Sequence, residues 1–142
     1  MPAFPFELVS PDRVLFSGPA QSVVVTGDEG DFQVLTDHAP LVTSVRPGFV
    51  VIEDAAGRPH RVYVRGGFAE VNPLGLILLA ETAIPFEDLS ASKLDQEIKN
   101  AEEDLADASE DQKRQAQEKL DRLRELRESL KNLTAGGADR SA

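Results

Sequence analysis

Short apolar runs alternate with turn residues along the first part of the chain, up to about residue 86. The runs are rich in β-branched residues, and clusters of proline, glycine or aspartate separate them at the regular spacing of an antiparallel sandwich or barrel. No long helical period lies between the runs, so parallel βαβ topology is not expected. A β domain is therefore predicted over residues 1–86, with strands near 4–9, 14–16, 23–25, 32–35, 41–45, 49–52, 61–65, 68–71 and 76–80.

After residue 86 the spacing of apolar residues changes to that of a helix. Apolar residues recur every three or four positions, which places them on one face of a helix. The period fails near residue 107 and then resumes, so the pattern predicts two helices joined by a short turn. Their packing faces are expected to be formed by Leu94, Ile98, Ala101, Leu105, Ala116, Leu120, Leu123 and Leu130.

Local signals predict the bounds of these helices. Ser92 and Ser109 each stand three residues before an acidic or amide side chain, the pattern of a capping box. Gly136 and Gly137 are expected to end the second helix. The fold class predicted is α+β, an N-terminal antiparallel β-sandwich followed by a C-terminal two-helix antiparallel hairpin. The expected ranges are 87–135 for the hairpin, about 90–107 and 110–133 for its helices, and 136–142 for a flexible tail.

The second apolar stripe drifts around its helix. Leu126, Leu130 and Leu133 lie to one side of the face that begins at Ala116 and Leu120. In an antiparallel hairpin this end of the helix returns to the β domain. We therefore expect the additional leucines to pack on the β domain or on a partner.

Opposite charges on the two helices favour their pairing. Residues 87–111 hold ten acidic and two basic side chains, whereas residues 112–142 hold five acidic and eight basic ones. Each exposed pair contributes only about 0.2–1 kcal/mol, so charge sets the orientation more than the stability. The basic run from Lys113 to Lys131 has two interpretations: it pairs with the first helix, or it binds an acidic partner.

Composition narrows the classes of function. The 142 residues include no cysteine, which excludes disulfides, thiol nucleophiles and cysteine metal sites. The net charge of −10 argues against nucleic acid or anionic lipid as a partner. The N-terminus has no basic segment followed by a long apolar run, so no signal peptide is expected, and the apolar run at 74–80 is too short to span a bilayer.

The stretch 27–47 contains two sharp turns around one short strand, and the first turn carries three carboxylates, those of Asp28, Glu29 and Asp31. Glycines at 27 and 30 fix the bend, which is typical of a rigidly held contact loop. Calcium binding by these carboxylates is the alternative, but the loop offers few further oxygen donors.

No common catalytic motif is present: there is no phosphate loop, no nucleophile elbow and no metalloprotease helix. A catalytic interpretation of Asp37 and His38 would need a nucleophile such as Ser44, and nothing in the sequence brings Ser44 to them. A structural or contact histidine is the favoured interpretation. Arg61 and Arg65 share one strand face, which is expected to be an exposed polar face. No metal and no cofactor are expected.

Several ordered motifs resemble the epsilon subunit of rotary F-type ATP synthases. They are VSPDRVLFSG at 9–18, VTGDEGD at 25–31, HAPL at 38–41, RPG at 46–48, GGFAEV at 66–71 and LAETA at 79–83. The resemblance is dense over residues 4–86, whereas over 87–135 only the helical hairpin is similar. The family's fold is a flattened β-sandwich followed by two helices.

The resemblance implies a rotor subunit without catalytic activity of its own. Such a subunit binds the foot of the central gamma subunit and the ring of c subunits, so that rotation of the ring reaches the catalytic alpha/beta head. The residues that match the family's c-ring loop are Asp28, Glu29, Gly30 and Asp31. Those that match its gamma contact are His38 and, more weakly, Ser10. The implied location is peripheral, on the cytoplasmic face of the bacterial inner membrane, reached only through the complex.

In many bacterial members of this family the hairpin extends toward the head and inhibits ATP hydrolysis. Members that bind ATP carry Ile/Leu-Asp-x-x-Arg-Ala at the start of the first helix. Here Ser90, Lys93 and Leu94 replace the aspartate, arginine and alanine, so weak or absent ATP binding and modest inhibition are expected. The alternative function is a stand-alone β-sandwich adaptor that dimerises through its hairpin.

Overall fold

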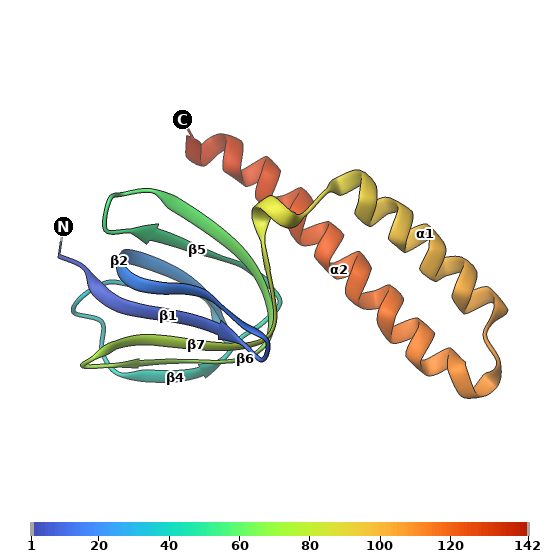
Figure 1. The fold of residues 1–142 in the computed structure, drawn as a ribbon, viewed down its shortest axis with the longest axis horizontal. Coiled ribbons are helices and arrows are strands. Elements are labelled where there is room, and N and C mark those ends of the chain that lie inside the picture. Colours follow the sequence, from blue (N-terminus) through green and yellow to red (C-terminus); the bar gives the residue numbers. More distant parts are fainter. Residues whose placement is uncertain (1, 142) are drawn as a thin grey trace. The chain divides into compact units, whose positions relative to one another are not determined.

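The computed structural model describes residues 2–141, with the side chains described up to residue 133. The chain forms two compact units, Met1–Asp88 and Leu89–Ala142 (Figure 1). Their boundary falls two residues after the one that the sequence predicts. The predicted tail at 136–142 includes residue 142, which lies outside the described residues.

Seven strands and one short 3₁₀ helix make up the first unit. The strands form one mixed sheet that curls into two layers, with the order β1-β7-β6-β5-β2-β3, a further pairing of β1 with β2, and β4 beside β6. The strand bounds are β1 Phe4–Ser10, β2 Arg13–Gly27, β3 Gly30–Val34, β4 Leu41–Ser44, β5 Gly48–Asp54, β6 Pro59–Asn72 and β7 Gly75–Pro85, followed by the 3₁₀ helix η1 Phe86–Asp88.

One pairing corrects the sequence prediction of a wholly antiparallel sandwich. Strands β1 and β7 run parallel, with Phe6 opposite Leu76 and Leu8 opposite Leu78, whereas the other pairings are antiparallel. The two strands lie some seventy residues apart in sequence and share no hairpin turn, so no local pattern could reveal their direction. The β-sandwich followed by two helices is confirmed.

Two strands belong to both layers, and each unites two of the predicted strands. Strand β2 pairs first with β1 and then with β3 and β5. Strand β6 pairs first with β5 and then with β4, and it lies beside β7 from Val62 onward. The turn of β6 from one layer to the other is made at Gly66 and Gly67, whose φ angles are +75° and +97°. A Cβ atom at Gly67 would clash with the carbonyl of Leu79, so the corner requires glycine.

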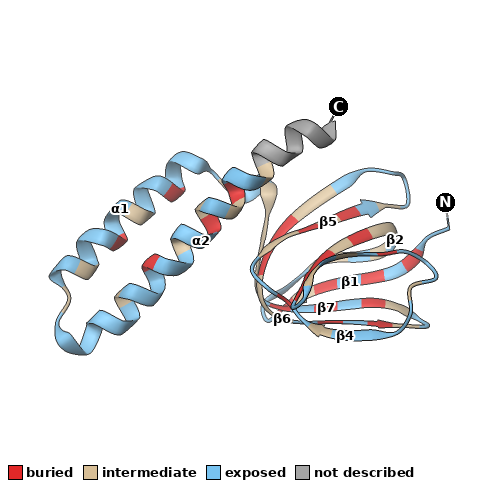
Figure 2. Cartoon of the chain, turned by 180° about the vertical axis from the view of Figure 1, so that it is seen from behind, coloured by how far each residue is buried: buried red, intermediate tan, exposed pale blue. Residues whose placement is uncertain are grey.

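The core of the first unit lies between the two layers. Burial alternates along β1 and along the first half of β7, so that every second side chain points inward (Figure 2). The largest fully buried apolar side chains of this unit are Phe6, Leu8, Val23, Val25, Val34, Val50, Ile52, Val64, Leu76 and Leu78. Burying a side chain of this size contributes about 1.5–3 kcal/mol, so this set dominates the stability of the unit.

The second unit is a pair of helices, α1 Ala91–Asp107 and α2 Glu110–Ser141. Ser90, and not Ser92, caps α1: its Oγ accepts a hydrogen bond from the Lys93 main-chain N at 3.3 Å. The predicted end of the second helix at Gly136 is wrong, because α2 continues to Ser141. Two glycines lower helix propensity by about 1 kcal/mol each but, unlike proline, leave the main-chain donors in place.

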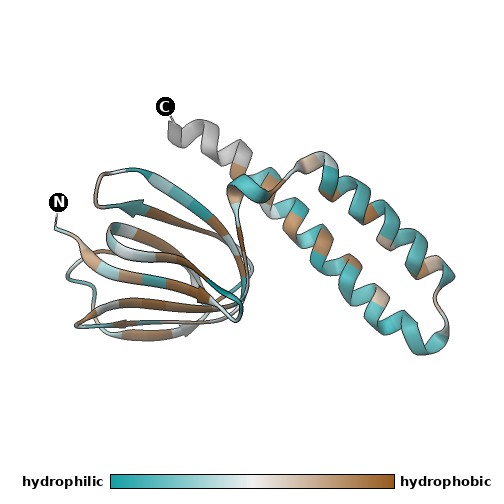
Figure 3. Cartoon of the chain, viewed as in Figure 1, coloured by the Kyte–Doolittle hydropathy of each residue, from teal (hydrophilic) through white to brown (hydrophobic). Residues whose placement is uncertain are grey.

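The charges of the two helices pair as the sequence predicts. Arg124 Nη2 lies 2.9 Å from Glu102 Oε2, and Arg127 Nε lies 2.7 Å from Asp95 Oδ1. The other surfaces of the hairpin are mostly hydrophilic (Figure 3). Leu126 is buried although the predicted packing face omits it. Among the side chains of this unit that the structure describes, the buried ones are Leu94, Ala101, Leu120, Leu126 and Leu130, while Ile98, Leu105, Ala116 and Leu123 are half-buried. Among the described residues, no helix has the length and apolarity that crossing a membrane requires.

Candidate functional site

The acidic turn, residues 28–31, connects β2 to β3. Gly27 and Gly30 form the last register pair of the two strands, which leaves Asp28 and Glu29 as a two-residue hairpin loop. Both residues are exposed. Gly30 has φ +127° and allows the chain to return to β3 at once. The turn therefore presents its carboxylates on a short, closely bounded loop, as the sequence predicts.

Residues 43–46, which are not part of the acidic turn, bind it and its flanking strands through hydrogen bonds and an ion pair. The Asp28 main-chain N donates to Thr43 Oγ1 at 3.2 Å. Arg46 Nε donates to the Gly27 carbonyl at 2.7 Å, and Arg46 Nη2 lies 3.7 Å from Asp31 Oδ1. These contacts reach both strands that flank the turn, so its direction is fixed by tertiary structure as well as by its glycines.

A surface hollow of about 560 Å³ lies beside the acidic turn. Strand β4 forms another of its walls, and Phe32 and His38 complete the lining. The structure thus brings together residues that the sequence assigns to two different contacts, the acidic turn and His38. The hollow is open and mixed in polarity, which suits a protruding side chain of a protein partner more than an enclosed small molecule.

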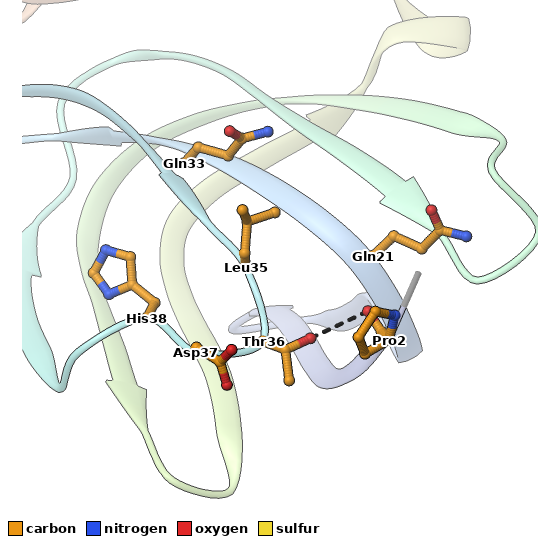
Figure 4. A pocket seen from close by; sticks show the side chains of 7 residues that line it. All are labelled: Pro2, Gln21, Gln33, Leu35, Thr36, Asp37 and His38. Atoms are coloured by element: carbon orange, nitrogen blue, oxygen red, sulfur yellow. Dashed lines mark hydrogen bonds between the residues drawn. The ribbon is translucent and has the colours of Figure 1, made fainter.

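The side chain of His38 is held by contacts within the chain. Its Nδ1 donates to the Ala39 carbonyl at 2.7 Å, and its ring centroid lies 5.7 Å from that of Phe32. It also lines a second hollow with Pro2, Gln21, Gln33, Leu35, Thr36 and Asp37 (Figure 4). Among the residues that line it, Thr36 Oγ1 donates to the Pro2 carbonyl at 3.1 Å, and the His38 main-chain N donates to the Leu35 carbonyl at 3.1 Å.

The catalytic and calcium interpretations find no matching geometry in the part of the chain that the structure describes. Ser44 makes no hydrogen bond with His38 in residues 2–133. In the same residues no group of three or more histidine, aspartate or glutamate side chains is placed to hold a metal ion.

Ser10, the second residue assigned to a gamma contact, is buried. Its hydroxyl bonds within the turn between β1 and β2, with Asp12 Oδ1 at 2.8 Å and the Arg13 carbonyl at 3.3 Å. The bond from Ser10 lowers the pKa of Asp12 below its ordinary value, and the nearby Arg13 adds to the effect. In this structure Ser10 shapes the turn, and no hydrogen bond links it to His38 among the described residues.

Strand register creates an apolar surface that the sequence analysis missed. Val14 lies opposite Val9, Val9 opposite Leu79, and Leu79 opposite Phe68, so these four residues cross the outer face of one layer in a single row. Val14 is 60% exposed and Phe68 48% exposed. We call Val9, Val14, Phe68 and Leu79 the apolar row. Contiguous exposed apolar surface is typical of protein interfaces.

Comparison with known proteins identifies the family. The sequence model of the β-sandwich domain of the ATP synthase delta/epsilon chain matches residues 3–86. The chain belongs to the ATP synthase delta/epsilon family. The resemblance that the motifs at 9–83 carry is therefore confirmed.

Two relatives extend the match beyond the family's β domain into the helices. The ATP synthase epsilon chain of Parvibaculum lavamentivorans is 51% identical over 126 residues, which cover 88% of this chain and 96% of that protein. The ATP synthase epsilon chain of Mesorhizobium japonicum is 45% identical over 118 residues, covering 83% of this chain and 87% of that one.

A solved structure shares the fold of this family member. A chain in the cryo-EM structure of the Euglena gracilis mitochondrial ATP synthase, OSCP/F1/c-ring, superposes with a TM-score of 0.74. The two chains are 23% identical, and the match covers 93% of this chain and 81% of the other. The agreement supports the β-sandwich with two helices as the architecture of the whole chain.

Proposed function

We propose that this chain is the epsilon-type rotor subunit of a bacterial F-type ATP synthase, non-catalytic itself, which couples rotation of the c-ring to the gamma subunit and the catalytic head. The observation that carries the proposal is the 51% identity with an ATP synthase epsilon chain across nearly all of that protein. In this role the chain sits peripherally at the cytoplasmic face of the inner membrane, where the complex holds it.

The acidic turn supplies the contact with the c-ring. Its carboxylates stand on a two-residue loop, fixed by Gly27, Gly30 and the segment 43–46. A coupling element must not slip, and charge-assisted hydrogen bonds to arginine or lysine of the c-subunit loops provide a directional contact. The net charge of −10 adds attraction to a basic partner.

The apolar row supplies part of the contact with the gamma subunit. Phe68 and Val14 offer large exposed apolar surface on a rigid sheet, which is the usual character of the centre of a stable interface. His38 belongs to the same gamma contact, from the hollow beside β4. The helical hairpin adds a regulatory contact with the alpha/beta head when it extends, with modest inhibition of ATP hydrolysis.

Charge reversal in the assembled complex tests the c-ring contact. Asp28→Lys, Glu29→Lys and Asp31→Lys together are expected to reduce proton-coupled ATP synthesis strongly and to spare hydrolysis by the catalytic head. The matched control reverses three exposed acids elsewhere in the β unit, Glu53, Glu81 and Glu87. Unchanged coupling after the first set, or an equal loss after the second, would show that the turn is not the electrostatic contact.

A further inference from the structure

Arg46 contacts both strands that flank the acidic turn. Its main-chain N donates to the Thr26 carbonyl at 2.7 Å, and its carbonyl accepts from Thr26 Oγ1 at 2.7 Å. Its side chain bonds to the Gly27 carbonyl on β2 and lies beside Asp31 on β3. Thr26 is only 5% exposed, so these bonds anchor Arg46 to the core of the sheet.

The bond between Arg46 Nε and the Gly27 carbonyl acts at the base of the turn. Gly27 is the last paired residue of β2, and a Cβ atom there would come within 2.8 Å of the Phe32 ring. A tightly packed residue with its carbonyl fixed by a charged donor leaves the next two residues little freedom of direction. The bond therefore sets the angle at which Asp28 and Glu29 leave the sandwich.

Arg46 also divides the three acids of the turn into two kinds. Asp31 has a cation 3.7 Å from its carboxylate. The carboxylates of Asp28 and Glu29 make no ion pair and accept no hydrogen bond within the described residues, and both residues are exposed. Asp31 therefore has a cationic neighbour within the chain, whereas Asp28 and Glu29 have none in the described residues and keep their full capacity to accept hydrogen bonds.

We propose that Arg46 is the positioning residue of the c-ring contact: it bonds to the Gly27 carbonyl, pairs with Asp31, and holds Asp28 and Glu29 outward as the two acids that bind a cationic side chain of the c-subunit loop. This inference rests on the proposed function, which assigns the acidic turn to the c-ring. It adds that the three acids are unequal and that the order of the turn depends on one arginine outside it.

Amide hydrogen exchange of the full chain tests the positioning step without any partner. Arg46→Met is expected to raise the exchange rate of the segment 27–31 about tenfold, the loss expected when a hydrogen bond from a charged donor is removed. Exchange in β1 and β7 should remain that of the wild type, which also shows that the variant folds. Arg46→Lys keeps the charge but lacks the fixed Nε–H donor, so it should recover only part of the protection.

A matched control replaces an arginine elsewhere on the sheet. Arg65 Nη2 donates to Thr82 Oγ1 at 3.1 Å, far from the turn in the register, and Arg65→Met should leave exchange at 27–31 unchanged. Equal protection of 27–31 in the wild type and Arg46→Met would overturn the inference. Full recovery by Arg46→Lys would overturn the role given to the bond with Gly27.

Crosslinking in the assembled complex tests the functional consequence. Asp28→Cys is expected to form a disulfide with a cysteine in the polar loop of subunit c, and Arg46→Met should lower the yield several-fold while co-purification with gamma is unchanged. If no crosslink forms with Arg46 intact, the proposed function of the turn fails. If the crosslink forms equally well in both backgrounds, the function stands and the positioning role of Arg46 fails.

Discussion

Arg127 and Asp95 join the two helices of the hairpin across thirty-two positions of sequence, with Arg127 Nε 2.7 Å from Asp95 Oδ1. The hydrogen bond that Arg127 donates to Asp95 raises the pKa of Arg127 above its ordinary value. The Arg127–Asp95 pair and the Arg124–Glu102 pair together fix the antiparallel register of α1 and α2. The two pairs lie on the outside of the hairpin, where salt weakens them.

Reversing one member of this pair should loosen the hairpin, and reversing both should restore it. We expect Arg127→Glu to lower the thermal midpoint of helix melting, because it places two carboxylates together. Added salt, which screens that repulsion, should raise the midpoint of the variant. Asp95→Arg with Arg127→Glu should recover most of the loss. Circular dichroism at low and high salt measures the effect. Arg114→Gln is the control, since Arg114 pairs with Glu118 within α2 only; an equal effect of both variants would contradict a pairing between helices.

Gly67 is expected to be the glycine least tolerant of substitution. Gly67→Ala combines the strain of a positive φ with a clash against the Leu79 carbonyl and should destabilise the β unit by about 3 kcal/mol or more. Gly57 also has a positive φ, +82°, but a Cβ there meets nothing within 4 Å. Gly57→Ala should therefore cost only about 1 kcal/mol. Urea unfolding measures the loss of stability in both variants, and the difference between them gives the contribution of the clash. Equal losses of stability would contradict the role given to Gly67 at the β6 corner.

Asp54 makes the loop between β5 and β6 sensitive to acid. Its Oδ2 accepts from His60 Nε2 at 2.8 Å, and its Oδ1 accepts from the main-chain N atoms of Arg58 and Ala56, each at 2.9 Å. These bonds, that from His60 above all, lower the pKa of Asp54 below its ordinary value. Because the folded pKa is depressed, the contribution of the carboxylate is complete above a pH of about 4 and is lost as the pH falls through the folded value.

The variant Asp54→Asn should therefore be less stable than the wild type at neutral pH and equally stable in strong acid. Asparagine is uncharged and keeps one acceptor oxygen, as the protonated carboxyl group does, so the variant resembles the acid form of Asp54. Urea midpoints measured between pH 2 and 7 give the difference. Asp37→Asn, at an exposed aspartate outside this loop, is the control and should track the wild type throughout. A difference that persists unchanged into strong acid would contradict the prediction.

The apolar row should be required for gamma binding. Phe68→Glu places a charge on the aromatic residue at one end of the row and is expected to weaken co-purification with gamma at least about tenfold, as loss of an aromatic interface anchor does. Leu74→Glu is the matched control, because Leu74 is 83% exposed in the turn between β6 and β7, outside the row. Gamma binding that survives Phe68→Glu, in a variant with a normal unfolding transition, would remove the row from the interface.

The start of α1 should bind Mg-ATP weakly or not at all. The hydroxyl of Ser90 is engaged in capping the helix, and Leu94 is 4% exposed, so neither residue presents a group that a nucleotide needs. Calorimetric titration of the isolated chain should give no saturable binding below about 1 mM ATP, the range of a weak complex. Clear binding at lower concentration would mean that other residues replace the degenerate motif at 89–94.

Local patterns were sufficient to predict the two units and the pairing of the helices. The alternation in Phe4–Ser10 and the helical period that starts at Leu94 each depend on near neighbours in sequence, and both are present in the structure. The acidic turn was also predictable, because Gly27 and Gly30 bound it directly.

Features that depend on distant pairing were not predictable. The sequence divides β2 at Gly18 and β6 at Gly66, whereas the structure continues both strands through those glycines. The apolar row exists only because the registers of four strands align Val14, Val9, Leu79 and Phe68. Arg46 was missed for the same reason: its partners Gly27 and Asp31 lie fifteen or more positions away.

The passage of β2 and β6 through both layers has a mechanical consequence. Two layers held only by side-chain packing can slide over each other under shear, because dispersion contacts are individually weak and have no fixed direction. In this unit the main chain passes from one layer to the other twice, once within β2 and once within β6. A twisting force applied at the tip of β2 passes along covalent bonds and strand hydrogen bonds into β1 and β5 together. The unit therefore resists torsion as a closed shell does, which is the property that a part turning between a motor and its load must have.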